Sequence, residues 1–224
     1  MHKALIFDCD GVLVDSEVLL IDIEIETMAE YGLHYTPERF KELYLGTSID
    51  AFYETAHREH NRVHGTPLPE CYSSKVHDRV STAFDKHLEP VVGIADLLSN
   101  IDHLDLAVAS NSQQKWLDRK MAHTSLNDFF GTHIYSSEIV ENGKPAPDIY
   151  LYAANQIQAD PTKCIVVEDS INGVKAAKAA NMTCISFSGG GHCDDIHVEK
   201  LKNSIADHHA HDADELFRLI KELS

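Results

Sequence analysis

Four short apolar runs rich in β-branched residues constrain the fold of this chain more than any other feature. They span residues 4–7, 106–109, 164–167 and 184–187. Each has the length and composition of a buried strand in a parallel sheet. The first three end abruptly in polar residues, and helical patterns follow the second and third, as in βαβ units. We therefore expect a doubly wound α/β core, with the polar clusters meeting at the carboxyl edge of one sheet.

About ninety residues separate the first two runs, far more than an ordinary crossover connection needs. Apolar residues recur there at helical spacing, which predicts four helices over 17–31, 37–44, 48–59 and 69–86. The stretch Ile21–Glu26 alternates like a surface strand, but the stripe of Leu20, Ile23, Thr27 and Tyr31 favours a helix. We predict a catalytic core of residues 1–15 and 87–224 and an inserted helical cap domain of residues 16–86.

The composition is that of a soluble protein. The 224 residues are 43% apolar, which is enough for a sizeable core. The five cysteines are odd in number and lack CxxC spacing, so neither a disulfide framework nor a structural zinc site is indicated. No apolar run approaches the ~20 residues of a membrane span, and charge appears too early for a signal peptide. We expect a cytoplasmic protein that does not bind membranes.

The formal net charge of −17 limits the choice of ligands. Such a charge repels nucleic acid and opposes anionic metabolites as well. A site for phosphorylated molecules would therefore need its own cation, from a metal ion or a lysine.

Asp8 and Asp10 stand two residues apart directly after the first apolar run, and Gly11 lets the backbone turn sharply. Two such carboxylates can divide the work of catalysis: one acts as a nucleophile and the other moves a proton to the leaving oxygen. A solvated Asp-Gly turn accounts for the motif about equally well when it is taken alone.

Polar residues at the other strand ends offer complementary chemistry. Glu168 and Asp169 supply the hard oxygen ligands that magnesium prefers, although a helix cap is the simpler explanation for them in isolation. Ser110-Asn111-Ser112 provides hydroxyl, amide and backbone donors where the next helix begins, or serves as an ordinary cap. Lys144, held between Gly143 and two prolines, is the local cation that the acidic chain requires.

These segments, in their order along the chain, resemble the four motifs of the haloacid dehalogenase superfamily. The matching segments are 8–16, Ser110-Asn111, 144–148 and Glu168-Asp169-Ser170 with Gly173. The chain is most similar to the branch of beta-phosphoglucomutase and sugar-phosphate phosphatases, which carries a helical cap after the first motif. This resemblance covers essentially the whole chain.

The resemblance implies a role for each matching carboxylate. Asp8 would be the nucleophile that forms an aspartyl-phosphate, and Asp10 the general acid that later activates water. Mg²⁺ would be held by Asp8, the main-chain carbonyl of Asp10 and Asp169, with Glu168 nearby.

The remaining roles concern the phosphate and the rest of the substrate. Ser110 and Asn111 would bind the transferring phosphoryl group, and Lys144 would neutralise its charge. Gly46, Thr47 and Ser48 are the predicted specificity loop of the cap, because the glycine separates two helices there.

The resemblance implies a Mg²⁺-dependent phosphatase of small phosphorylated metabolites, with sugar phosphates as the expected class. Leu20 and Ile49 stand where the mutases carry a histidine and an arginine, which weakens the alternative of a phosphosugar mutase. Asp10 argues against a dehalogenase, and Lys41 and Lys75 are unsupported candidates for the Schiff-base lysine of a phosphonatase. A non-catalytic phosphate-binding protein is the alternative outside the enzymes. We expect a monomer with a small-molecule substrate and no nucleic-acid partner.

Two further clusters have simpler explanations. The histidines of 208–211 lie in a polar stretch before the last helix, and we interpret them as a surface loop or helix entry rather than a metal site. The glycines of 189–191 lack the Lys-Ser/Thr of a P-loop, so we interpret them as a flexible turn beside the site.

Overall fold

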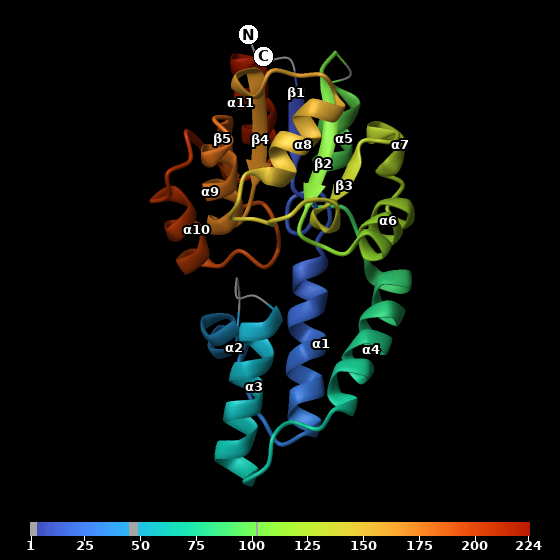
Figure 1. The fold of residues 1–224 in the computed structure, drawn as a ribbon, viewed down its shortest axis with the longest axis vertical. Helices are drawn as coiled ribbons and strands as arrows, with labels where there is room; N and C mark the ends of the chain where they lie inside the picture. Colours follow the sequence, from blue (N-terminus) through green and yellow to red (C-terminus); the bar gives the residue numbers. More distant parts are fainter. Residues whose placement is uncertain (1–3, 45–48, 102) are drawn as a thin grey trace. The chain divides into compact units, whose positions relative to one another are not determined.

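The computed structural model describes residues 4–44, 49–101 and 103–224. The chain divides into two compact units, one formed by Met1–Ser16 with Leu88–Ser224 and the other by Glu17–His87. The first unit is an α/β domain and the second is helical (Figure 1).

Six parallel strands form the sheet of the α/β unit, in the order β3-β2-β1-β4-β5-β6. The strands are β1 (Ala4–Phe7), β2 (Asp105–Ser110), β3 (Ile134–Ser136), β4 (Cys164–Glu168), β5 (Thr183–Phe187) and β6 (His208–Ala210). The order reverses between β1 and β4, so the sheet is doubly wound and has its switch point there. This architecture confirms the predicted fold class.

The helices of the α/β unit lie between its strands along the chain, except the last one, which follows β6 (Figure 1). They are α5 (Ile94–Ser99), α6 (Gln114–His123), α7 (Asn127–Phe130), α8 (Asp148–Gln156), α9 (Ile171–Ala179), α10 (Asp195–Lys202) and α11 (Ala213–Leu223), with short 3₁₀ turns at Ser137–Ile139 and Pro161–Lys163.

Both faces of the central strands are buried, which explains why their sequences are continuously apolar. Every residue of β1 is buried, and side chains of β1, β2 and β4 pack with Ile149 and Tyr150 of α8 and Val174 of α9 in one core. On the opposite face, Phe7 meets the ring of Phe130 of α7 edge to face, at a centroid distance of 5.9 Å. Two packed layers therefore hold the strand ends in fixed positions.

The helical unit contains α1 (Ser16–Glu30), α2 (Pro37–Tyr44), α3 (Ile49–His64) and α4 (Cys71–His87). The alternating stretch Ile21–Glu26 lies inside α1, which confirms the helical prediction. Buried residues of α4 recur at a spacing of four, with Val76, Val80 and Phe84 on one stripe. Among the described residues, no helix has both the length and the apolar character needed to cross a bilayer.

Two edge strands, β3 and β6, were not predicted from the sequence. β6 corrects the interpretation of the histidine cluster as a loop or helix entry, because residues 208–210 pair with β5. The side chains of one residue pair also meet, with His209 Nδ1 lying 3.0 Å from Ser186 Oγ. β6 is only three residues long, two of them histidines, so it carries no alternating pattern that would distinguish a strand from a loop.

Candidate active site

The predicted polar clusters lie together at the carboxyl edge of the sheet. Asp8 follows β1, and its main-chain NH donates to Val167 O of β4 at 3.0 Å. β1 also pairs with β2, which ends at Ser110. The switch point between β1 and β4 therefore brings Asp8 beside Asp169, the first residue after β4.

Lys144 is a buried cation at this edge. Its Nζ lies 2.5 Å from Asp8 Oδ1 and 2.6 Å from Glu168 Oε1, and its side chain is only 4% exposed. Asn111 fixes the main chain of Lys144 from both sides, since its Oδ1 accepts from Lys144 N at 3.0 Å and its Nδ2 donates to Lys144 O at 3.2 Å. The Asn111 amide thus orients the lysine backbone.

Glu168 connects Lys144 to the start of α9. Its Oε1 also accepts from Tyr150 Oη at 2.9 Å, and its Oε2 accepts from the main-chain NH and the hydroxyl of Ser170 at 2.9 Å each. At Gly173, a Cβ atom would stand 1.7 Å from Glu168 Oε1, so only glycine fits there. Both carboxylate oxygens of Glu168 are therefore held by protein donors.

Asp8, Glu168 and Asp169 form a buried cluster with one oxygen of each lying within 4.8 Å of the others. Burial and the neighbouring carboxylates raise the pKa of Asp8 well above its usual value, against the opposing effect of Lys144. Burial and Glu168 likewise raise the pKa of Asp169. When ionised, three carboxylates beside one ammonium leave an excess of negative charge. Carboxylate oxygens are suitable ligands for a hard divalent cation such as Mg²⁺.

Asp10 has a different environment. Its Oδ1 lies 2.5 Å from Nζ of Lys120, and its Oδ2 accepts from Ser112 Oγ at 2.6 Å. Ser16 Oγ also donates to Oδ1. Burial raises the pKa of Asp10, but the charge of Lys120 and the hydrogen bonds outweigh it and hold the pKa below its usual value.

Lys120 of α6 was missed by sequence reasoning. Its side chain is 3% exposed, and its Nζ also donates to Ser112 Oγ at 2.9 Å. A signal was available, because Lys120 shares the buried face of α6 with Leu117 and Met121. A lysine in the apolar stripe of a helix is rarely buried without a charged partner.

The structure places some of the other predicted residues and does not describe the rest. Ser110 is buried at the end of β2, where its Oγ accepts from Ser112 N at 3.0 Å. The predicted specificity loop of Gly46, Thr47 and Ser48 lies outside the described residues. The glycine turn after β5 is tied to the first motif, since Gly191 N donates to Asp15 Oδ1 at 3.1 Å.

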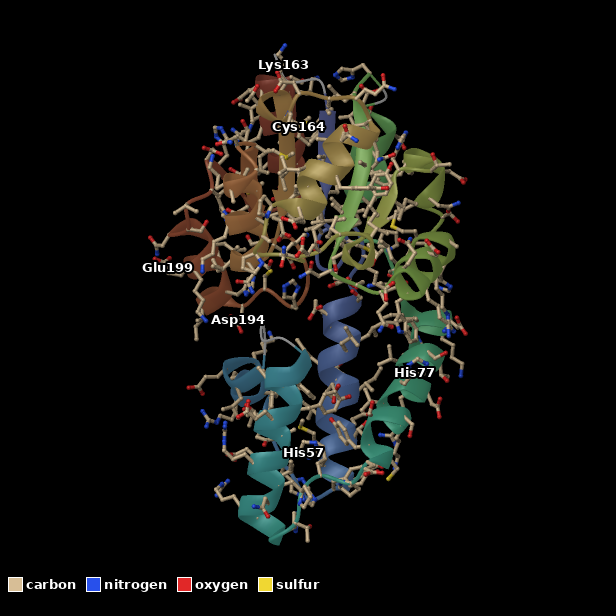
Figure 2. All side chains as sticks on the ribbon, in the orientation of Figure 1. His57, His77, Lys163, Cys164, Asp194 and Glu199 are labelled. Atoms are coloured by element: carbon tan, nitrogen blue, oxygen red, sulfur yellow. The ribbon has the colours of Figure 1, made fainter. Side chains whose placement is uncertain are left out.

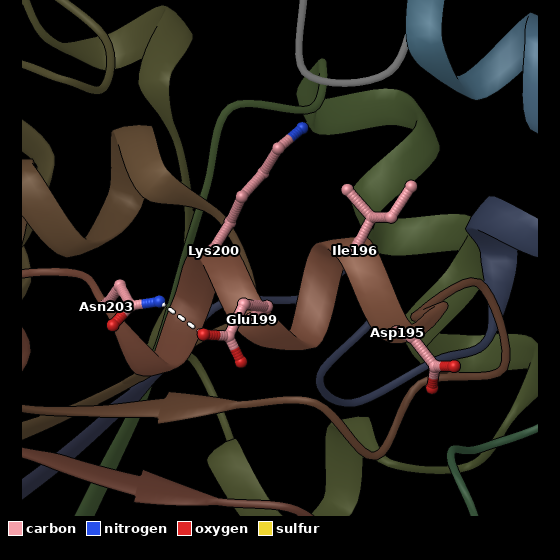
Figure 3. A pocket seen from close by; sticks show the side chains of 5 residues that line it. All are labelled: Asp195, Ile196, Glu199, Lys200 and Asn203. Atoms are coloured by element: carbon pink, nitrogen blue, oxygen red, sulfur yellow. Dashed lines mark hydrogen bonds between the residues drawn. The ribbon is translucent and has the colours of Figure 1, made fainter.

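Two features lie outside the carboxylate cluster. A hollow on α10 is lined by Asp195, Ile196, Glu199, Lys200 and Asn203, with Asn203 bonded to Glu199 (Figure 3). It contains none of the predicted catalytic residues. His192, Cys193 and His197 form a second group whose candidate ligand atoms lie within 4.8 Å of one another.

Comparison with known proteins identifies the family. The family of haloacid dehalogenase-like hydrolases matches residues 5–187. This chain belongs to that family. Its motifs and doubly wound sheet are thus family features, and the predicted resemblance is confirmed.

Several relatives cover most of the chain. Hexitol phosphatase B of Escherichia coli is 31% identical over 81% of this chain and 82% of its own length. The 6-phosphogluconate phosphatase of the same species is 28% identical over 85% of this chain and 84% of its own. A crystal structure of a haloacid dehalogenase-like protein of unknown function from Agrobacterium tumefaciens has a TM-score of 0.88 at 28% identity and covers 100% of this chain and 99% of its own.

Proposed function

We propose that this protein is a Mg²⁺-dependent phosphatase that hydrolyses small phosphorylated metabolites, of which sugar phosphates are the favoured class, through an aspartyl-phosphate on Asp8. Membership of a hydrolase family and the named phosphatases among the relatives support the class of phosphoric monoester hydrolase. The finer assignments of nucleophile, metal and substrate are our proposal.

One observation supports the mechanism above all. Asp8 lies at the switch point of the sheet with Lys144 Nζ 2.5 Å from its Oδ1, and that ammonium is fixed by Glu168 and by Asn111. A carboxylate attacking a phosphate ester meets an anion, so it needs a positioned cation that can balance the charge of the transferring group. Lys144 is such a cation.

The reaction would proceed in two steps. Asp8 attacks phosphorus, the bond from phosphorus to the ester oxygen breaks, and Asp10 gives the leaving alkoxide the proton that it took from water in the preceding turnover. Asp10, now a carboxylate, then removes a proton from water as that water attacks phosphorus. The bond between Asp8 and phosphorus breaks, and inorganic phosphate leaves.

Asp10 must be deprotonated for the second step, and its surroundings suit that form. Lys120, Ser112 and Ser16 all donate to its carboxylate, which favours the charged state. We propose that these donors hold Asp10 in place and that Lys120 keeps it ionised for the second step, while the lowered pKa opposes its protonation for the first step.

Asp8 and Asp169, with the main-chain carbonyl of Asp10, would hold the Mg²⁺ ion. A bound Mg²⁺ would neutralise negative charge on the phosphate oxygens. Glu168, whose oxygens are held by protein donors, would position Lys144 from behind these ligands.

The helical unit of Glu17–His87 is proposed as a cap that selects the substrate and excludes water. Similarity to a 6-phosphogluconate phosphatase and to a hexitol phosphatase supports phosphorylated sugars, sugar acids and sugar alcohols as the class to examine.

The test is phosphate release from a panel of hexose phosphates, hexitol phosphates and 6-phosphogluconate, with and without Mg²⁺. The proposal predicts turnover that requires Mg²⁺, is lost in Asp8→Asn and is strongly reduced in Asp10→Asn. Isomerised sugar phosphate without net phosphate release would instead indicate a mutase. Ligand binding with neither outcome would contradict an enzymatic role.

A further inference from the structure

The turn after β5 brings a buried histidine against a proposed metal ligand. His192 Nε2 lies 3.2 Å from Asp169 Oδ2, and the two side chains are 2% and 7% exposed. Cys193 Sγ lies 3.4 Å from the same nitrogen. With its proton on Nε2, the His192 ring donates to the carboxylate and restricts the direction in which Asp169 points.

A second histidine holds the main chain of the same residue. His197 Nε2 lies 2.7 Å from Asp169 O, so its proton is directed at that carbonyl. Asp194, labelled in Figure 2, caps α10 by accepting from His197 N at 2.9 Å. The cap fixes the first turn of α10, and thereby the place from which His197 reaches Asp169.

Gly11 of the first motif lies close to both Asp169 and His192. Gly11 has a φ of 73°, and a Cβ atom there would stand 2.0 Å from Asp169 Oδ2 and 2.6 Å from His192 Cε1. Glycine is therefore required at residue 11 both for its backbone conformation and for the close approach of the pair. The rings of His192 and His197 meet edge to face, with centroids 5.2 Å apart.

We infer that His192 and His197 are positioning residues that hold the side chain and the main chain of Asp169 in the geometry that binds Mg²⁺. The inference rests on the proposed function, in which Asp169 is a metal ligand. It assigns a role to the glycine turn and to the start of α10, which the sequence motifs leave unexplained.

The contacts favour this role over a transition-metal site built from His192, Cys193 and His197. Both Nε2 atoms are directed at Asp169, one at its carboxylate and one at its carbonyl. Hydrogen-bond partners behind a metal ligand fix its orientation, and removing one costs about 10- to 100-fold in metal affinity or activity.

The experiment measures Mg²⁺ binding directly, by isothermal titration calorimetry on the full chain without substrate. His192→Phe and His197→Phe should each weaken Mg²⁺ binding by about 10- to 100-fold. His192→Gln, which keeps a donor, should recover part of that loss. His133→Phe is the matched control, because His133 bonds Tyr135 in the same unit and should leave Mg²⁺ affinity unchanged.

Unchanged Mg²⁺ affinity in both phenylalanine variants would overturn the inference. Equal losses in the glutamine and phenylalanine variants would also overturn it, since a donor to Asp169 would then be irrelevant. If a phenylalanine variant does not fold, the glutamine variant at the same residue decides: weaker Mg²⁺ binding than wild type supports the inference, and unchanged binding overturns it. Wild-type protein that binds no Mg²⁺ would contradict the proposed function itself, whereas normal Mg²⁺ binding in all variants contradicts only this inference.

Discussion

Two aspartates after the end of β1 each contact a buried lysine ammonium, but their pKa values shift in opposite directions. Lys144 lies 2.5 Å from Asp8, and Lys120 lies 2.5 Å from Asp10. The pKa of Asp8 is raised, while that of Asp10 is lowered. The difference comes from what else surrounds each pair.

Lys144 contacts two carboxylates, whereas Lys120 and two serine hydroxyls donate to the same carboxylate. Lys144 also serves Glu168, and Asp169 adds a third carboxylate to that cluster. At Asp10, the hydroxyls of Ser112 and Ser16 add to the ammonium. The ratio of hydrogen-bond donors to carboxylates thus sets the charge state of each aspartate. Around Asp8 the negative charge exceeds the positive charge and a metal cation can compensate it, whereas Lys120 and two hydroxyls already compensate the charge of Asp10.

Of the lysine variants, Lys144→Met should cause the largest loss of kcat. The variant leaves Asp8 and Glu168 without their shared cation, so kcat should fall by about 10²- to 10³-fold, as for loss of a group that stabilises transition-state charge. Steady-state phosphate release in saturating Mg²⁺ measures the loss.

Lys178→Met is the matched control for that variant. Lys178 pairs with Asp207 on the surface of the same unit, with 29% of its side chain exposed. Its removal should leave kcat unchanged. A loss below about tenfold in Lys144→Met would contradict the role given to Lys144.

Lys120→Met should have the next largest effect. Two hydroxyls still hold Asp10 in this variant, so we expect a decrease of about 10- to 100-fold in kcat with little change in KM, which is smaller than the ~10²- to 10⁴-fold contribution of a general acid–base itself. Because Lys120 is proposed to act through Asp10, adding Lys120→Met to Asp10→Asn should cause little further loss. Additive losses in this double-mutant cycle would show that Lys120 acts by another route.

Glu24, a half-buried carboxylate in the helical unit, is expected to show the smallest of these effects. Its hydrogen-bond partner is the hydroxyl of Tyr72 instead of an ammonium, and burial raises its pKa from 4.5 to about 7. The folded state therefore binds more protons than the unfolded state in this window. The free energy of unfolding should fall as the pH rises from 4.5 to about 7.

Glu24→Gln should remove this pH dependence. At pH 8 the variant should be more stable than wild type by about 1 to 2 kcal/mol, after allowance for partial exposure of the site. Urea unfolding at pH 5 and pH 8 measures the effect, with Glu26→Gln, an exposed change on the same helix, as control. A variant that keeps the wild-type slope would contradict a raised pKa for Glu24.

The carboxylates on the Asp8–Lys144 side of the site could be predicted from the sequence, because they lie at the ends of strands that the sequence marks clearly. Lys144 was predicted instead from its turn of two prolines and from the family resemblance. β1 and residues 164–167 of β4 are uninterrupted apolar runs; Asp8 directly follows β1, and Asp169 directly follows β4. Where parallel strands end, the fold itself brings distant residues together.

The Asp10–Lys120 side could not be found in this way. Lys120 lies within a helix, and its distance from Asp10 depends on how α6 packs, which no local pattern encodes. The same holds for His192 and His197, whose contacts with Asp169 depend on the turn after β5. β6 was missed because two histidines and one alanine at a sheet edge are too short a run to show strand periodicity.

The central claim is that Asp8 carries the phosphoryl group during turnover. Acid quenching of single-turnover reactions with the best substrate of the panel, labelled in its phosphate, tests it most directly. We expect label bound covalently to Asp8 in wild type, more label in Asp10→Asn, where the base for water attack is missing, and none in Asp8→Asn. Phosphate release from Asp8→Asn at the wild-type rate, with no labelled protein in either form, would contradict it.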